Sequence, residues 1–404
     1  MDKQTCSKCV LHTRVPNVTI GEDGICSVCS NERNNERMNK IMVKYFSHKL
    51  KELIRSIKQH KWPYDALVLF SGGKDSTYLL KMAKEEYGLK VLAFSVIHPL
   101  VNKTAAKNAE DVANKLGVDL MKFYPVEDEY KNIIRYSLLK GYKAIEDECL
   151  GCYTCSFIFK NAALMTAMRM NIPVVFDGID IDQSETIIFM EGREMKKNAA
   201  VGIKPFGKIH DVVMQGLGES YKGSIYDFDF ELLKDYNFPS FISPFTFLNY
   251  DFRENNTLFK ELNLESKDFR TVFTNCSAVP FFSYFSLKRY DCLTYIRHYA
   301  SEIRKNYPFL LQSKIDNSIK PNALSKETIE ALSEEYRNVI YYVANGNIDK
   351  SNITKANREE ILNMASTHQS IYGKEVCEIF LEQALEINRY AHFFNINLME
   401  IQQG

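Results

Sequence analysis

A short apolar run followed by a glycine pair constrains the fold of this 404-residue chain more than any other feature. Residues 66–70 read Ala-Leu-Val-Leu-Phe, which is typical of a strand buried on both faces of a sheet. The run ends in Ser71-Gly72-Gly73-Lys74-Asp75-Ser76, and apolar residues at helical spacing follow it. Glycines let a backbone approach an anion closely, and the free N–H groups at a helix start favour a bound phosphate. The segment therefore predicts a phosphate-binding turn between a strand and a helix.

Three further apolar runs alternate with segments of helical periodicity. The runs cover residues 91–96, 120–124 and 174–176, and helices are expected between them, the last over 156–170. Strands that alternate with helices are typical of a doubly wound α/β fold with a mostly parallel sheet. Ligands of such sheets bind at the carboxyl ends of the strands, which is where the glycine turn is expected to lie.

Two Cys-x-x-Cys pairs stand in the first thirty residues, Cys6 with Cys9 and Cys26 with Cys29. Four thiolates on two tight turns can close a tetrahedral shell around Zn²⁺, which needs no open position when its role is structural. So short a stretch has little core of its own, and metal binding is therefore expected to be coupled to its folding. The alternative is four unligated thiols in a flexible arm.

Composition excludes some classes of function. Lys and Arg number 51, and Asp and Glu also number 51, so no global positive field draws the chain to nucleic acid. No segment approaches the roughly 20 consecutive apolar residues of a membrane span, and the first residues lack the apolar core of a signal peptide. We therefore expect a cytoplasmic protein that does not interact with membranes. Clustered cysteines in a reducing compartment bind metals or react more often than they form disulfides.

These patterns predict a chain of several regions. One helix is expected over residues 287–306, and Ser325 is expected to cap a later one. The expected regions are a zinc knuckle (1–35), a linker helix (36–62), a nucleotide-binding domain (63–230), a mixed substrate-side region (231–310) and a helical C-terminal domain (311–404).

The glycine turn resembles the SGGxDS signature of the PP-loop ATP pyrophosphatases, the adenine nucleotide alpha hydrolase-like group. That family cleaves ATP between its α and β phosphates and places AMP on a substrate oxygen. The resemblance implies an enzyme whose residues Ser71, Gly72, Gly73, Lys74, Asp75 and Ser76 hold the pyrophosphate, with Lys74 and Asp75 also catalytic. It further implies that the adenosine lies near Ser95 and Ile97, after the second strand.

A second segment, residues 177–186, is similar to the G-H-x-x-D-D-x-x-E-T segment of the PP-loop enzymes that modify tRNA. The match is partial, because Ile179 stands where the family has His or Asn and Ile181 separates two acids. Carboxylates beside a polyphosphate would hold Mg²⁺. Asp182 and Glu185 are the first candidates for this catalytic role, with Asp180 and Gly178 beside the nucleotide. The alternative is a solvated acidic loop.

Three thiols at two-residue gaps, Cys149, Cys152 and Cys155, stand just before the helix expected at 156–170. They could hold a 4Fe–4S cluster or a second zinc, or Cys152 and Cys155 could relay sulfur as a persulfide. Cys276 is the candidate fourth ligand. Simple buried cysteines are the alternative.

Over residues 5–185 the chain is similar to the N-acetyl sugar amidotransferases of surface-polysaccharide (lipopolysaccharide) biosynthesis. Those proteins also begin with a Cys-x-x-Cys knuckle, and residues 14–29 follow the outline of their next segment. The resemblance implies replacement of a carbonyl or amide oxygen by nitrogen, a sugar-like substrate and a separate glutaminase subunit that delivers ammonia. Cys155, residues 182–186 and the C-terminal helices depart from this pattern.

Two other interpretations stay open. PP-loop tRNA thiolases combine a zinc knuckle, the loop, a Cys-x-x-Cys and one later cysteine around an Fe–S cluster, so sulfur transfer to tRNA or to a small molecule is the first alternative. A binding protein that holds a nucleotide without turnover is the second.

Overall fold

The computed structural model describes most of the chain. The described residues are 2–101, 103–184, 186–219, 222–248, 250, 258, 261–262, 276–304, 325–372 and 374–401. Glu185, one of the predicted magnesium ligands, lies outside the described residues. Within them the chain forms two compact units. One, the knuckle unit, comprises residues 1–35, 134–152 and 269–404, and the other, the sheet unit, comprises residues 36–133 and 153–268.

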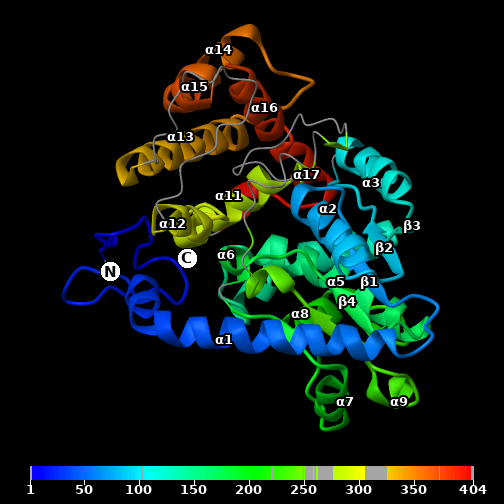
Figure 1. The fold of residues 1–404 in the computed structure, drawn as a ribbon. Coiled ribbons are helices and arrows are strands. Elements are labelled where there is room, and N and C mark those ends of the chain that lie inside the picture. The colour runs from blue at the N-terminus through cyan, green and yellow to red at the C-terminus, as the bar shows by residue number, and fades with distance from the viewer. Residues whose placement is uncertain are drawn as a thin grey trace. The chain divides into compact units, whose positions relative to one another are not determined.

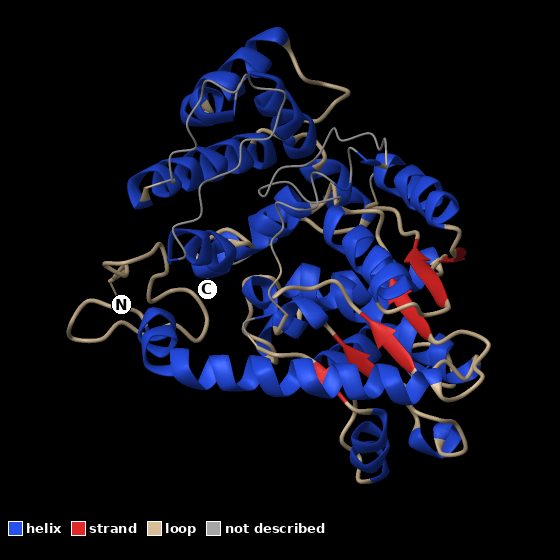
Figure 2. Cartoon of the chain, viewed as in Figure 1, coloured by secondary structure: helices blue, strands red, loops and turns tan. Residues whose placement is uncertain are grey.

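The sheet unit is built on six strands (Figure 2). They are β1 (Ala66–Leu69), β2 (Val91–Val96), β3 (Asp119–Phe123), β4 (Val174–Phe176), β5 (Phe189–Met190) and β6 (Ser240–Ile242). Their order is β3-β2-β1-β4-β6-β5, and all run parallel except β5, which pairs antiparallel to β6 at the edge. The strand order reverses between β1 and β4, which makes their carboxyl ends the switch point where doubly wound sheets bind ligands. The predicted α/β fold with a mostly parallel sheet is confirmed.

Helices cover both faces of this sheet (Figure 1). The helices and short turns of this part of the chain are α1 (Ser27–Lys58), α2 (Lys74–Lys81), η1 (Met82–Glu86), α3 (Lys103–Leu116), α4 (Glu127–Leu139), η2 (Gly141–Lys143), α5 (Leu150–Arg169), α6 (Ile181–Ser184), α7 (Gly192–Ala200), α8 (Lys208–Leu217), α9 (Phe230–Leu233) and η4 (Pro244–Thr246). On one face, Val68 and Ala93 pack with Ile54 of α1 and with apolar residues of α2 and α3. Their neighbours Leu67 and Leu92 pack on the other face with α5 and α7.

The knuckle unit combines the N-terminal cysteine segment with a set of helices rich in aromatic residues. These are α11 (Val279–Tyr290), α12 (Ile296–Arg304), α13 (Lys326–Asn345), α14 (Lys355–Met364), α15 (Ser366–Tyr372), α16 (Lys374–Ala384), α17 (Ile387–Phe393) and η5 (Leu398–Glu400). Phe281 of α11 stacks on Phe394, with ring centroids 5.5 Å apart. Ser325 caps α13 as predicted, because its Oγ accepts from the amide of Thr328 at 3.2 Å.

Two predicted helix limits were wrong. The helix expected over 156–170 begins six residues earlier, at Leu150, so Cys152 and Cys155 lie within α5 and not before it. The single helix expected over 287–306 is two helices. Asp291 adopts a left-handed backbone with φ of 55°, and this ends α11 before α12 begins. No helix among the described residues is both long enough and apolar enough to cross a bilayer.

Candidate functional site

The turn after β1 is braced by its own serine hydroxyls. Ser76 Oγ donates to the carbonyl of Gly73 at 3.1 Å and lies 3.2 Å from Ser71 Oγ. Backbone amides close the turn, because Ser71 N donates to Ser76 Oγ and Gly73 N donates to Ser71 Oγ, both at 3.3 Å. Gly73 precedes α2, whose first amides have no acceptor within the helix. The turn between strand and helix lies where it was predicted, and the start of α2 leaves amides that favour an anion, but phosphate binding there stays a prediction.

Glycines allow two backbones to meet at this point. Gly72 has φ of +74°, a left-handed conformation that side chains rarely adopt. At Gly178, just after β4, an added Cβ would lie 3.3 Å from the amide nitrogen of Ser76. The segment after β4 therefore touches the backbone of the turn after β1. The residues predicted from two separate motifs come together at the switch point of the sheet.

Lys74 and Asp75 begin α2 and carry the charge of the turn. Burial lowers the pKa of Lys74 to about 8, and Asp75 acts in the opposite direction. The Tyr250 hydroxyl donates a hydrogen bond to Asp75 Oδ1, and its ring stacks on Phe245 with centroids 3.9 Å apart. Tyr250 was not predicted as a site residue, because a residue 175 positions away leaves no local signal.

The acidic segment after β4 is only partly described. Asp180 caps the short helix α6, since its Oδ1 accepts from the amide of Gln183 at 2.9 Å. Asp182 lies in α6 and is half-buried, whereas the position of Glu185 is outside the described residues. The role of these carboxylates as Mg²⁺ ligands stays a prediction.

An ion pair that was not predicted lies beside this segment. Lys160 Nζ of α5 lies 3.3 Å from Asp177 Oδ2, the first residue after β4, and the two side chains are 12% and 13% exposed. Ser243 Oγ, after β6, donates to the same carboxylate oxygen at 3.4 Å. Lys160 is the one charged residue of α5 before Arg169 in its last turn, and this was the signal that could have found the pair.

The predicted adenosine positions lie at the end of β2. Ser95 is buried, and the amide of Ile97 donates to the carbonyl of Phe123 at 2.8 Å. The next residue, His98, begins a buried chain of hydrogen-bonding groups. Its Nδ1 lies 3.2 Å from the Tyr130 hydroxyl, which lies 3.1 Å from Cys155 Sγ. Burial lowers the pKa of His98 to about 3, so this imidazole is neutral at physiological pH.

Cys149, Cys152 and Cys276 form a separate group of half-buried thiols around Tyr295. Cys152 Sγ lies 3.5 Å from the Tyr295 hydroxyl, and Cys149 Sγ contacts the carbonyl of Thr294. Burial raises the pKa of Cys152 to about 12, to which the nearby Cys276 contributes. Burial likewise raises the pKa of Tyr295, and all three cysteines add to that effect. The sulfur atoms of these three cysteines do not all lie within 4.8 Å of one another, so the structure does not bring them together as a closed set of metal ligands.

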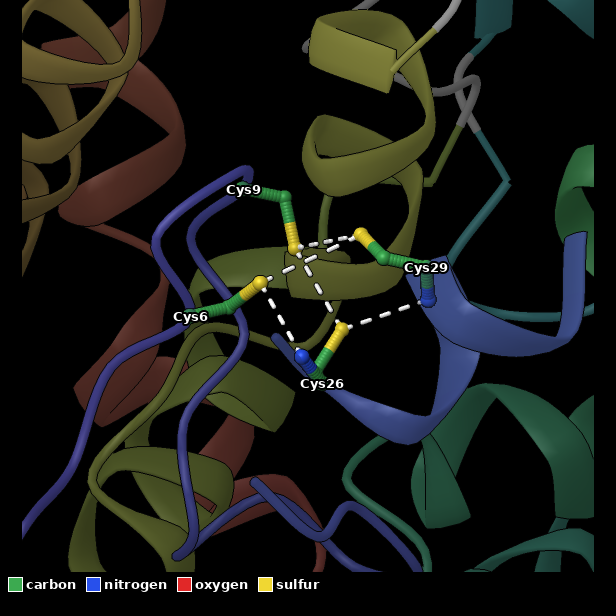
Figure 3. Close-up of side chains that lie close together, drawn as sticks. All are labelled: Cys6, Cys9, Cys26 and Cys29. Atoms are coloured by element: carbon green, nitrogen blue, oxygen red, sulfur yellow. Dashed lines mark hydrogen bonds between the residues drawn. The ribbon is translucent and has the colours of Figure 1, made fainter. Parts of the chain in front are cut away.

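The four N-terminal cysteines converge on one point (Figure 3). All are buried, and their sulfur atoms lie within 4.8 Å of one another, the one such group of three or more potential ligands among the described residues. Three of the Sγ–Sγ distances are 3.9, 3.7 and 3.6 Å. A Zn–S bond of about 2.3 Å in a tetrahedron gives an edge of about 3.8 Å. The donor set and its spacing therefore fit a tetrahedral metal ion.

Backbone amides support these thiols as ligands. The amides of Cys26 and Lys8 donate to Cys6 Sγ at 3.2 and 3.4 Å. The amide of Cys29 donates to Cys26 Sγ at 3.4 Å, and hydrogen bonds from Cys29 and Cys9 lower the pKa of Cys26. N–H groups aimed at sulfur stabilise thiolates, which are the form that binds a metal.

The mostly parallel sheet carries its glycine turn and the Gly178 contact at the carboxyl ends of β1 and β4. Residues 65–167 match the family model described as Queuosine biosynthesis protein QueC. This match confirms the resemblance to PP-loop ATP pyrophosphatases for that part of the chain.

Known proteins resemble the chain over part of its length. The "Uncharacterized protein MJ1599" of Methanocaldococcus jannaschii is 26% identical over 198 residues, which are 48% of this chain and 63% of that protein. The chain thus spans less than two thirds of this relative.

Two solved structures align at 15% and 14% identity. NMN synthetase from Francisella tularensis aligns over 55% of this chain and 71% of its own, with a TM-score of 0.31. U34-tRNA thiolase NcsA from Methanococcus maripaludis, solved with its 4Fe–4S cluster, aligns over 79% of this chain and 94% of its own, with a TM-score of 0.29.

Proposed function

We propose that this protein is an ATP-dependent enzyme that adenylates a carbonyl or amide oxygen of its substrate and releases pyrophosphate. The observation that carries the proposal is the meeting of the 71–76 turn with Gly178 at the β1–β4 switch point. The start of α2 offers backbone N–H groups, and Lys74 offers a cation, to the β and γ phosphates. Mg²⁺ held by Asp180, Asp182 or Glu185 would neutralise the leaving pyrophosphate.

In the proposed step the substrate oxygen attacks the α phosphorus of ATP. A new bond forms between that oxygen and phosphorus, and the bond from phosphorus to the α,β-bridging oxygen breaks. The bridging oxygen keeps the electron pair and leaves as part of pyrophosphate. The residues of the turn hold this group in line, and such positioning with charge stabilisation supplies most of the catalysis in phosphoryl transfer.

The adenylated oxygen must then be displaced by a second nucleophile. The similarity to N-acetyl sugar amidotransferases over residues 5–185 supports nitrogen, with a sugar-like substrate and ammonia from a separate glutaminase. One observation on the structure supports sulfur instead. Cys149, Cys152 and Cys276 are half-buried and lie near Tyr295. A cluster or persulfide held there would supply sulfur for thiolation of tRNA or of a small molecule.

Pyrophosphate release tests the adenylation step. Lys74→Ala and Asp75→Asn are expected to abolish release from ATP in the presence of the acceptor, because both residues belong to the turn. Lys196→Ala is the matched control, since this lysine of α7 lies outside the turn and donates to the carbonyl of Tyr236. All variants are expected to unfold at the temperature of the wild type. Full release by both turn variants would contradict the proposal, and binding of ATP without turnover in the wild type would favour a nucleotide-binding protein.

Anaerobic purification separates the two nucleophiles. A brown protein with iron near one cluster per chain, lost in Cys152→Ser, supports sulfur transfer. A colourless protein that contains zinc alone and uses ammonia supports nitrogen transfer.

A further inference from the structure

The ion pair between Lys160 and Asp177 is built into the carboxyl end of the sheet. Asp177 follows β4 directly, and its amide donates to the carbonyl of Ile242 in β6 at 2.9 Å. Its Oδ2 atom accepts from the buried Ser243 and lies 3.3 Å from Lys160 Nζ. Asp177 is thereby fixed by two strands, and it fixes the lysine in turn.

Stability does not explain this pair. Around Lys160, helix α5 packs apolar residues such as Ala162, Ala163 and Leu164 against the sheet. Charges taken out of water lose hydration, and well-packed apolar residues often hold such an interface equally well. The pair is therefore better explained by a function of the ammonium group.

The place of the pair indicates what that function is. Asp177 is the neighbour of Gly178, whose backbone meets Ser76 of the turn. The turn lies at the end of β1, and β1 pairs with β4 through Leu67 and Val175. Ligands of such sheets bind outside the carboxyl ends of the strands at the switch point, so a nucleotide whose terminal phosphates occupy the turn has its remaining phosphate at the ends of β1 and β4, where Asp177 lies.

The Lys160 ammonium has N–H donors that Asp177 does not use. It carries three N–H groups, and Asp177 is its one acceptor among the residues that the structure describes. The Lys160 side chain is 12% exposed, so its ammonium group is held in place and is still accessible to a ligand. An anionic oxygen is the partner that such a group binds best.

We propose that Lys160 is a catalytic residue that binds the α-phosphate of the nucleotide, and that Asp177 is its positioning residue. The inference rests on the proposed adenylation and assigns the phosphates to different groups. The turn holds the β and γ phosphates, whereas Lys160 binds the non-bridging oxygens of the phosphorus that is attacked. Those oxygens keep their negative charge through the transfer, so a fixed cation there favours attack by the substrate oxygen.

Titration calorimetry with three ligands tests this assignment. Pyrophosphate reports the turn alone, AMP reports the α-phosphate site alone, and α,β-methylene-ATP reports both. In the presence of Mg²⁺, Lys160→Met is expected to weaken AMP and α,β-methylene-ATP at least tenfold and pyrophosphate less than twofold. Lys160→Arg is expected to keep AMP affinity within about threefold of the wild type. Asp177→Asn is expected to weaken AMP but not pyrophosphate, because it releases the lysine without touching the turn.

The outcomes distinguish this inference from the proposal on which it rests. Retained pyrophosphate binding shows that each variant is folded at the turn, and Lys196→Met is the matched control for loss of a lysine. Unchanged AMP affinity in Lys160→Met, or an equal loss for AMP and pyrophosphate, would overturn the role of Lys160 and leave the proposed function standing. A wild type that binds no pyrophosphate would overturn both.

Discussion

At the scale of single residues, Lys74 has the environment with the most direct consequence for ligand binding. Its ammonium is largely buried at the start of α2, and burial lowers its pKa to about 8 from the usual 10.5. The group therefore loses half of its charge near pH 8, close to physiological pH. Asp75, fixed by the Tyr250 hydroxyl, opposes this shift.

This pKa predicts a pH dependence of pyrophosphate binding. Below about pH 8 Lys74 is protonated and attracts the anion, and above it the neutral amine does not, so affinity is expected to fall as the pH rises. Lys74→Arg stays charged over this range and is expected to remove that part of the fall. Calorimetry of both proteins from about pH 6.5 to about pH 9.5 measures how pyrophosphate affinity changes with pH. Pyrophosphate itself titrates over this range, and the arginine variant shows how much of the change in affinity comes from the ligand alone. Parallel profiles for the two proteins would show that Lys74 does not face the anion.

At the scale of elements, backbone contacts at glycines decide how the strands and helices pack. Gly192 begins α7, where an added Cβ would lie 1.9 Å from the carbonyl oxygen of Phe238, just before β6. Backbone atoms cannot move aside as the end of a flexible side chain can. The close approach of α7 to the sheet therefore requires glycine.

Gly192→Ala is expected to destabilise the fold by roughly 3 kcal/mol, because forced overpacking displaces α7 or β6. Gly202→Ala is the matched control, since nothing lies within 4 Å of an added Cβ and only the positive φ of 82° opposes the change. Its cost is expected to be about 1–2 kcal/mol at most. Urea denaturation measures the free energy of unfolding of both variants. If Gly192→Ala lowers the free energy of unfolding no more than Gly202→Ala does, the packing argument is contradicted.

The sequence predicted elements well where a local pattern determines them. The apolar run at 66–70 and the glycine turn are local signals, and the structure has both where they were predicted. The start of α5 was missed, because Cys149 to Cys155 was interpreted as a ligand segment although it also continues the helix. Tyr250 and the pair between Lys160 and Asp177 depend on contacts between distant segments. No local pattern encodes such contacts, and their discovery required the fold.

At the scale of the whole molecule, the cysteine knuckle joins distant parts of one unit. The Lys326 ammonium donates to the carbonyl of Cys6 at 2.8 Å, and Arg297 contacts the carbonyl of Pro16. Arg297 Nε also donates to Glu148 at 2.7 Å, beside Cys149. Loss of the knuckle therefore removes one partner from α12 and one from α13, and the α12 residue concerned, Arg297, also holds Glu148.

Metal removal is expected to destabilise this unit while the turn of the other unit still binds its ligand. Chelation, or Cys9→Ser, is expected to lower the unfolding temperature of one calorimetric transition by more than about 5 °C, because metal binding is coupled to folding of the knuckle. Pyrophosphate affinity is expected to stay within twofold. Cys377→Ser, at a buried cysteine outside both thiol groups, is the control for loss of a thiol. An unchanged transition after chelation, with metal content measured as zero, would contradict the structural role.

The contacts of the knuckle also determine the order in which the protein can be completed during synthesis. Residues 36–268 contain every segment of the sheet unit and leave the ribosome before α12 and α13 do. Cys6 and Pro16 emerge earlier still, but their partners Arg297 and Lys326 follow about 300 residues later, roughly half a minute at about ten residues per second. The earliest part of the nascent chain must therefore wait with its sulfur atoms unprotected unless a metal ion arrives, and we expect translation speed and metal supply to determine the yield together.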